Sequence, residues 1–407
     1  MKKKLNRIFV ILLVVLLSIS SQLILNAKAI GTVYIRDNGS IEGDGLKLEN
    51  GIYVFTSDIY GQITIEKDNI IVDGSGYILH AMDEGTILLE NVENVTLRNI
   101  EVIDTDFGIT LKNSHYNKIE RSTCIIKIEN SQFNTIHQNK QISLFLSNST
   151  NNTIKENNIT DPPLYGIKLQ AESNQNNIHK NNITNCKSGI NFHGNSSHNN
   201  IYENNISVNG NALIFYNSYH NLVHDNSIRN NRGSYIYFRG ASSNQFFRND
   251  FIENNGSIVC WYCTNIWDNG VEGNYWSDYN GTDPDGNGIG NIAYSILTLH
   301  LSGEDYDYDN YPLMTPITNS QWIYEYKGFY IEQVDDKFIV SERYLETYIS
   351  PLFSTIEEAK EWVDEGTTTP NPNEPEFPTI LVISVVAIAA IIGVCILSYR
   401  IKNNRKT

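Results

Sequence analysis

The chain has 407 residues, of which 19% are charged and 41% are hydrophobic, and its formal net charge is −16. The first 29 residues contribute five positive charges and the last eight contribute four, so residues 30–399 carry −25. A chain this acidic repels nucleic acid and other polyanions and attracts cations, which excludes nucleic acid as a partner.

The N-terminus has the pattern of a secretory signal. Three lysines and an arginine precede an apolar run from Ile8 to Leu25, and Ala27 and Ala29 form a small-residue cleavage site. We therefore expect residues 1–29 to be removed after Ala29 during export. An uncleaved N-terminal anchor is the alternative.

An internal repeat dominates residues 66–270. An apolar residue stands two positions after an asparagine seven times, with spacings of 17, 18, 24, 23, 22 and 23 residues. The seven pairs are Asn117 and Ile119, Asn134 and Ile136, Asn152 and Ile154, Asn176 and Ile178, Asn199 and Ile201, Asn221 and Val223, and Asn244 and Phe246. Short alternating runs bounded by Asn, Gly and Ser lie between them, so each unit is two or three strands joined by tight turns.

One such coil cannot bury its apolar side alone, but stacked coils bury a continuous core. Asparagine recurring in one phase tolerates a left-handed turn and can hydrogen-bond to its equivalent one coil away. The sequence therefore predicts an all-β fold, a right-handed parallel β-helix, whose coils stack at about 4.8 Å. Residues 30–65 are expected to form an N-terminal cap, and residues 271–320 a C-terminal cap with an Asp/Gly loop.

The remaining segments predict attachment to a membrane. Residues 321–366 contain strand-like runs and a capping box from Ser354 to Glu357 that opens an amphipathic helix, which together indicate a small α+β module. A Pro/Thr linker follows at 367–379. Residues 380–399 carry no charge and are long enough to cross a hydrocarbon core of about 30 Å as one transmembrane helix. The basic residues in 400–407 keep that tail cytoplasmic, so we expect a cell-surface protein with most of the chain outside.

Three sequences resemble the archaeal branch of the NosD-like β-helix proteins: IIVDGSGYIL at 70–79, GNYWSDYNGTDPDGNGIGNIAY at 273–294 and DNYPLM at 309–314. With the Asn-x-Ile coils, the likeness spans about residues 33–314. That family is called periplasmic copper-binding, and its module is also described as a carbohydrate-binding and sugar-hydrolysis domain. Residues 375–378, the apolar span and the basic tail also resemble sorting signals of archaeal surface proteins, which implies replacement of the span by a lipid anchor.

The loop after the last repeat is a candidate calcium site. Asp283, Asp285 and Asn287 place oxygen side chains at loop positions 1, 3 and 5, a glycine follows at position 6, and Asn291 stands at position 9. This is the first half of the pattern that a calcium loop needs, but position 12 is a tyrosine instead of a glutamate. Asp278 or the acidic run 304–309 is expected to supply the missing carboxylate. The alternative is a turn that closes the last coil without an ion.

The cysteines and histidines do not indicate a redox or copper centre. Cys260 and Cys263 have CxxC spacing, but no βαβ unit surrounds them, and the repeat register places Cys260 outward and Cys263 inward. Four cysteines outside the span are too few for a disulfide scaffold. His198 and His220 lie in adjacent coils and are expected to form a stacked pair, so copper binding is not expected.

The same register predicts an outward aromatic face. It places Lys168, Asn191, Phe215, Tyr237 and Cys260 in one row, and Gln170, His193, Asn217, Arg239 and Tyr262 in the next. Exposed rings flanked by amides and an arginine suit stacking on sugars with hydrogen bonds at their edges. The predicted carbohydrate-binding residues are therefore Phe215, Tyr237, Arg239, Tyr262, His193 and Asn217. Strand propensity alone is the other explanation for these aromatic residues.

No catalytic residue is predicted, because the coils show no clustered acids or basic motif of the kind that polysaccharide-cleaving enzymes need. Ten Asn-x-Ser/Thr sequons fit a glycosylated surface protein, although Asn158, Asn182 and Asn205 recur in one repeat phase and are discounted. The expected function is surface interaction with glycans or envelope components. A polysaccharide hydrolase or lyase and a copper-handling maturation factor are the alternatives.

Overall fold

The computed structural model describes residues 29–81, 87–162, 164–300 and 303–317 of a first compact unit, and four strands between residues 323 and 348 of a second. The predicted helix at 354–363, the linker 367–379, the apolar span 380–399 and residues 1–28 of the predicted signal lie outside the described residues. In the part of the chain that is described, no helix is long and apolar enough to cross a membrane.

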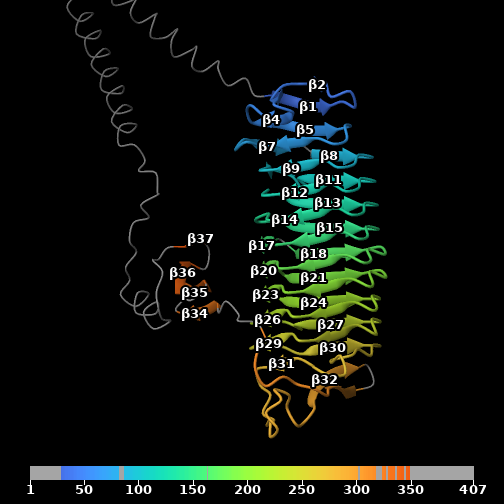
Figure 1. The fold of residues 1–407 in the computed structure, drawn as a ribbon, viewed down its shortest axis with the longest axis vertical. Coiled ribbons are helices and arrows are strands. Elements are labelled where there is room, and N and C mark those ends of the chain that lie inside the picture. The colour runs from blue at the N-terminus through green and yellow to red at the C-terminus, as the bar shows by residue number, and fades with distance from the viewer. Residues whose placement is uncertain are drawn as a thin grey trace, which may run out of the picture. The chain divides into compact units, whose positions relative to one another are not determined.

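The first unit is a stack of coils in which equivalent strands of successive coils pair in parallel (Figure 1). The sixteen strands of the first sheet are β1 (Ala29–Ile35), β2 (Ile41–Glu42), β5 (Ile59–Ile65), β7 (Ile78–Ala81), β8 (Ile87–Glu90), β10 (Glu101–Ile103), β11 (Ile109–Lys112), β13 (Ile125–Glu129), β15 (Ser143–Ser147), β18 (Tyr165–Gln170), β21 (Ser188–His193), β24 (Asn211–Tyr216), β27 (Ile236–Arg239), β30 (Ile258–Trp261), β32 (Tyr294–His300) and β33 (Gly303–Asp309).

Two shorter sheets complete the coils. The second sheet contains β3 (Leu46–Glu49), β4 (Ile52–Phe55), β6 (Ile71–Asp73), β9 (Thr96–Arg98), β12 (Lys118–Glu120), β14 (Thr135–His137), β16 (Thr153–Lys155), β19 (Asn177–His179), β22 (Asn200–Tyr202), β25 (Leu222–His224) and β28 (Gln245–Phe247). The third contains β17 (Asn158–Thr160), β20 (Asn182–Thr184), β23 (Asn205–Ser207), β26 (Ser227–Arg229), β29 (Asp250–Ile252) and β31 (Tyr275–Trp276). The predicted parallel β-helix is confirmed.

Antiparallel pairs mark the two ends of the stack. β1 pairs with β2 and β3 with β4 at the beginning, and β32 pairs with β33 at the end. The second unit is described separately as an antiparallel sheet of β34 (Ile323–Tyr326), β35 (Phe329–Val334), β36 (Lys337–Glu342) and β37 (Leu345–Tyr348).

The apolar anchors of the repeat form the core. Ile119, Ile136, Ile154, Ile178, Ile201, Val223 and Phe246 are aligned in register on the second sheet, and each is fully buried. Burial of such a side chain stabilises the fold by about 1.5–3 kcal/mol. The core changes character along the chain, because aliphatic side chains fill the early coils and aromatic rings fill the last ones.

The repeated asparagines form ladders that run along the stack. Asn204 is typical: its backbone N–H and its Nδ2 both donate to Asn226 Oδ1 of the next coil, at 3.0 and 2.9 Å. The same Nδ2 donates at 2.8 Å to the carbonyl of Ile178 in the preceding coil. The first ladder contains Asn117, Asn134, Asn152, Asn176, Asn199, Asn221, Asn244 and Asn265, and the second contains Asn139, Asn157, Asn181, Asn204, Asn226, Asn249 and Asn274. The predicted bonding between equivalent asparagines is confirmed.

The left-handed turn falls on a different residue from the one predicted. Every ladder asparagine from Asn117 to Asn249 directly follows a residue with positive φ, such as Phe133 at 57°, His198 at 57° or Arg248 at 52°. The asparagine itself supplies the hydrogen bonds. The two roles that the sequence analysis assigned to asparagine are therefore divided between neighbouring residues.

The second ladder ends on a buried carboxylate. The backbone N–H of Asn274 donates to Asp309 Oδ2 at 2.7 Å, at the position where a further coil would supply an asparagine oxygen. Trp276 Nε1 donates to the same oxygen at 2.9 Å, and the N–H of Tyr311 donates to Oδ1 at 3.1 Å. A Cβ at Gly273 would lie 1.7 Å from Asp309 Oδ1, so only glycine fits there. Burial raises the pKa of Asp309 to about 6.

Candidate functional site

The strand register of the first sheet decides which residues face outward. Ile190, Leu213, Ile236 and Ile258 are aligned in a buried row. One row on the outer side of the sheet contains Lys168, Asn191, Ile214, Tyr237 and Val259, of which Asn191, Ile214 and Val259 are buried. The next row contains His193, Tyr216, Arg239 and Trp261. We call His193, Tyr216, Tyr237 and Arg239 the tyrosine face, since Tyr216 contacts both His193 and Tyr237.

The prediction that Phe215 binds carbohydrate is wrong, because Phe215 belongs to the core. Its ring is fully buried and lies 4.7 Å from that of Phe192 and 5.1 Å from that of Phe238, in a continuous stack through three coils. A sugar in solution cannot reach it.

The cause is a slip of one residue. The predicted register placed the inward residue thirteen positions after Ile201, Val223 and Phe246, which holds only from Val223 to Ile236. The coil before it is shorter, and Leu213 stands only twelve positions after Ile201. A shift of one residue moves every side chain to the opposite face of a strand. Tyr216, which the prediction missed, therefore faces outward.

A signal for the correct register was present in the sequence. The small residues Gly166, Gly189 and Ala212 each stand directly before the inward residues Ile167, Ile190 and Leu213. A Cβ at Gly189 would lie 2.7 Å from the carbonyl oxygen of Ala212, so this position is crowded by the next coil. Aligning the small residues would have placed Tyr216 outward.

The rings of the tyrosine face are tilted against one another. The ring of Tyr216 lies 5.3 Å from His193 and 5.5 Å from Tyr237, with interplanar angles of 47° in both cases. Rings at this angle cover each other only in part. Burial and the neighbouring Tyr237 raise the pKa of Tyr216, so its hydroxyl stays protonated at neutral pH. Arg239 is exposed beside them.

Asn191 adds an unused acceptor next to the tyrosine face. It lies in the same row as Tyr237, is 4% exposed, and its Oδ1 has no hydrogen-bond partner among the residues that the structure describes. A buried polar atom without a partner costs about 1–3 kcal/mol. Because this oxygen is itself buried, a ligand in solution does not reach it, as for Phe215.

The other two predicted residues lie at the edge of this surface. Asn217 and Tyr262 are exposed, but they follow β24 and β30 and adopt positive φ values of 46° and 57° in the turns. Tyr262 is 73% exposed. They border the tyrosine face and do not continue its rows.

A second aromatic row lies on the second sheet but is packed differently. The rings of His179, Tyr202, His224 and Phe247 stack at 4.6, 5.3 and 5.2 Å, and successive planes are parallel to within 5°. Each ring face covers its neighbour, so the row offers mainly ring edges to solvent. It is therefore a weaker candidate for stacking on sugars than the tyrosine face.

The predicted calcium residues share one exposed loop that is held by its own hydrogen bonds. Asp283 accepts from the backbone N–H of Asn287 at 3.1 Å and of Gly288 at 2.9 Å, and the bond from Gly288 leads in lowering its pKa. Asp285 accepts from Asn287 Nδ2 at 3.0 Å. Asn291 forms a separate pair with Thr282. Backbone donors and the neighbouring carboxyl group of Asp285 thus meet the carboxylate of Asp283.

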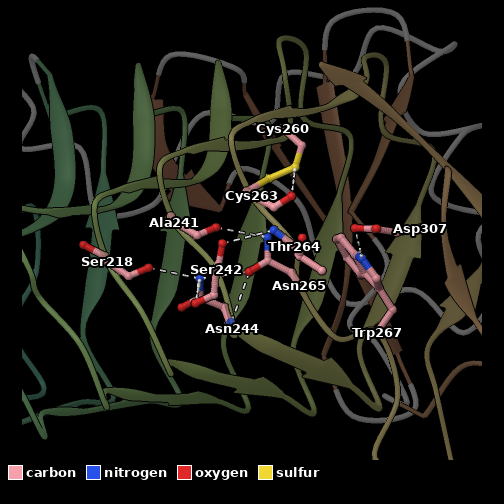
Figure 2. Close-up of a disulfide and its surroundings, with 10 residues drawn as sticks. All are labelled: Ser218, Ala241, Ser242, Asn244, Cys260, Cys263, Thr264, Asn265, Trp267 and Asp307. Atoms are coloured by element: carbon pink, nitrogen blue, oxygen red, sulfur yellow. Dashed lines mark hydrogen bonds between the residues drawn. A yellow bond between two sulfur atoms is a disulfide. The ribbon is translucent and has the colours of Figure 1, made fainter. Parts of the chain in front are cut away.

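The predicted orientation of Cys260 is wrong. Cys260 is aligned with Phe238 in the core, is 1% exposed, and forms a disulfide with the buried Cys263 (Figure 2). The bridge closes the turn that leads to Asn265, where the first ladder ends with a bond of 3.0 Å from Asn244 Nδ2. The same one-residue slip explains this error.

The histidine pair and the sequons are placed as follows. The rings of His198 and His220 lie 5.2 Å apart with a tilt of 30°. Across the described ranges, no group of three or more His, Cys, Asp or Glu side chains is arranged to hold a metal ion. Asn182 Nδ2 donates to Asn158 Oδ1, and Asn205 Nδ2 donates to Asn182 Oδ1, so two of the three discounted sequons use their amide nitrogens in a hydrogen-bonded stack.

A cavity of about 600 Å³ lies where the third sheet meets β32. Its described lining includes Tyr235, Glu253, Trp276, Asp278 and Tyr294. The sequence analysis missed it, because these residues come from different coils and from the non-repeating end of the chain. A cavity of this size is large enough for a small molecule, and most of its lining residues are polar.

Residues 125–276 match the family described as a right handed beta helix region, which agrees with the predicted handedness. None of the curated proteins matches the chain. Similar solved structures include the periplasmic alginate epimerase AlgG, at 17% identity and a TM-score of 0.37, covering 59% of this chain and 70% of the other.

Two further structures show the same range of similarity. The mannuronan C-5 epimerase AlgE6 A-module of Azotobacter vinelandii has 12% identity and a TM-score of 0.36, covering 55% of this chain and 81% of its own. A tailspike protein of E. coli bacteriophage HK620 in complex with a pentasaccharide has 11% identity and a TM-score of 0.41, covering 55% and 54%. The likeness to these proteins is one of fold alone.

Proposed function

We propose that this protein binds glycans through the tyrosine face. The observation that carries the proposal is the position of Tyr216 between His193 and Tyr237, with tilted rings that leave ring surface free. Sugar rings stack on such surfaces, while hydroxyl groups bond to groups at the edge. Arg239, which is exposed, supplies a donor there.

The proposal places the chain at a cell surface, as a NosD-like protein of the archaeal type. The signal pattern in residues 1–29 and the apolar span 380–399 support export and anchoring by the membrane or by a lipid. Glycans of the envelope and envelope proteins are then the available partners. A calcium ion in the Asp283 loop is a further proposal, supported by the spacing of Asp283, Asp285 and Asn287.

The test is a double substitution, Tyr216→Ala with Tyr237→Ala. Retention of the full chain is measured on immobilised starch, laminarin, xylan, alginate and pectate. We expect the double variant to lose retention on every polymer that holds the wild type, with an unchanged melting temperature. Phe247→Ala is the matched control, since it removes an aromatic ring from the second sheet and should leave retention unchanged.

Equal retention of wild type and double variant would refute the tyrosine face as the binding site. The same samples report on catalysis. Soluble reducing ends released from any one polymer, and absent after heat treatment, would replace binding by hydrolysis as the function. Unsaturated ends that absorb ultraviolet light would indicate a lyase.

A further inference from the structure

The cavity beside β32 is a second, distinct place where a ligand fits. It lies next to the residues that begin β30, in the last coils before the chain leaves the repeat. Phe251 and Trp276 form its inner wall, with ring centroids 4.4 Å apart, and both are almost fully buried. Tyr294 stacks on Trp276 at 4.3 Å with an interplanar angle of 12°. Tyr235 and Tyr294 are the half-buried rings that meet the open space.

The cavity is lined by two carboxylates together with asparagine, serine and tyrosine side chains. The Tyr294 hydroxyl donates to both carboxylate oxygens of Asp278, at 2.9 and 3.1 Å, so its proton is already in use. Asp278 is exposed and keeps free lone pairs. Glu253 adds a second carboxylate, and no lysine or arginine occurs among the described lining residues. A negatively charged ligand would meet two like charges here.

Tyr235 contributes a hydroxyl that the described protein does not use. Among the described residues this hydroxyl has no hydrogen-bond partner, although its ring packs on the core and lies 6.1 Å from that of Phe251. Burial, together with the charge of Asp278, raises the pKa of Tyr235, so the hydroxyl stays protonated and can donate or accept. The cavity therefore combines ring surface, carboxylate acceptors and one free hydroxyl.

The cavity is close to the tyrosine face along the chain. Tyr235 stands two residues before Tyr237, which corresponds to about 7 Å along a strand. A glycan of several residues lying on the tyrosine face is long enough to place its end in the cavity. A polymer with many hydroxyl groups and no charge matches both surfaces.

We propose that the cavity holds one neutral sugar residue at the end of a glycan whose following residues lie on the tyrosine face. This inference rests on the proposed glycan binding, to which it adds the selection of a chain end and the exclusion of acidic sugars. Asp278 and Tyr235 bind the hydroxyl groups of the end residue, and Tyr294 provides ring surface. Glu253 adds to the repulsion of uronic acids.

The test measures binding of methyl glycosides by saturation-transfer NMR. The full chain is produced without N-glycosylation, because the sequon at Asn255 lies in the lining of the cavity. The probes are the methyl glycosides of glucose, galactose, mannose and N-acetylglucosamine, with methyl glucuronide as the acidic counterpart. We expect at least one neutral probe to bind and the glucuronide to bind at least tenfold more weakly.

Two variants locate the binding. Tyr235→Phe removes a hydroxyl without a protein partner, so it should leave the melting temperature unchanged and weaken the neutral probe about fivefold to tenfold. Asp278→Asn keeps an acceptor for Tyr294 and removes the charge, so the preference for neutral over acidic probe should shrink severalfold. Tyr202→Phe, a hydroxyl on the second sheet, is the matched control and should change neither value.

The outcome separates this inference from the proposed function. The variant with both Tyr216→Ala and Tyr237→Ala should lose polymer retention and still bind the neutral methyl glycoside. If no methyl glycoside binds, or if Tyr235→Phe and Asp278→Asn leave binding unchanged, the cavity is not a sugar site, whatever the tyrosine face does. Equal binding of the neutral and acidic probes by the wild type would overturn the exclusion of acidic sugars.

Discussion

The middle coils and the C-terminal end of the β-helix satisfy the same hydrogen bonds by different means. In the middle coils each ladder asparagine is hydrogen-bonded to an equivalent asparagine in the coils before and after it. Each buried apolar residue is aligned with another apolar residue. At the end there is no next coil. The last donors meet Asp309, which stands 35 residues after Asn274, and a disulfide closes the last coil. The middle coils therefore repeat the same contacts, whereas the contacts at the C-terminal end occur once. The cavity lies at this C-terminal end.

The largest expected effect compares one substitution in each region. Asn204→Ala leaves the backbone N–H of Asn181 without its acceptor and removes the side-chain donor to the carbonyl of Ile178, which should cost about 1–3 kcal/mol. Asp309→Ala leaves the N–H groups of Asn274 and Tyr311 and the indole of Trp276 without theirs. The expected cost is about 3–5 kcal/mol in the free energy of unfolding, measured by urea denaturation.

Asp309→Asn is the control for that comparison. It keeps an oxygen for Asn274 and Trp276 and loses at most the bond from Tyr311, so it should cost about 1 kcal/mol at pH 4, where the carboxyl of Asp309 is protonated as well. If Asp309→Ala is no more destabilising than Asn204→Ala, the contacts of Asp309 contribute no more to stability than those of a ladder asparagine in the middle coils.

A smaller effect concerns the pH dependence of the end. Burial raises the pKa of Asp309 from 3.8 to about 6, so the folded protein keeps a proton there that the unfolded chain has lost. The stabilisation is fully present below about pH 4 and is lost as the pH rises through 6. The difference in free energy of unfolding between wild type and Asp309→Asn should therefore fall by about 2 kcal/mol from pH 4 to 7. A constant difference would show that Asp309 titrates normally.

The smallest effect concerns the Asp283 loop. Its own backbone already supplies partners for Asp283, so a calcium ion adds to a turn that holds its shape. Excess EDTA should lower the melting temperature by several degrees, because the bound ion stabilises the folded state. Asp283→Asn should melt at the same temperature with and without EDTA. Identical melting temperatures of the wild type with and without EDTA would contradict calcium binding by this loop.

The sequence predicted the coils well because the same residues recur at equivalent positions in successive coils. Seven asparagines in one phase identified the fold and the bonds between equivalent residues. The register of the first sheet failed because it was carried over from one coil to the next, although the coil between Val223 and Ile236 is one residue longer than that between Ile201 and Leu213. That slip exchanged Phe215 and Tyr216 and reversed Cys260.

The end of the molecule could not be predicted from a pattern, because it has none. Asp309 looked like one acid in an acidic run, and nothing local shows that it accepts from Asn274 and Trp276. The cavity likewise depends on Tyr235 and Asp278 meeting across coils. Contacts of this kind follow from three-dimensional packing, which a single sequence does not display.

The asparagine ladders also make the length of the molecule adjustable. Every rung in the middle coils presents the same donors to one side and the same acceptor to the other, so a duplicated or deleted coil leaves both neighbours matched. Each such event changes the distance between the two ends by about 4.8 Å and alters neither of them. The length of the β-helix is thus set by the number of its coils. A change in that number leaves the end that contains the cavity unchanged.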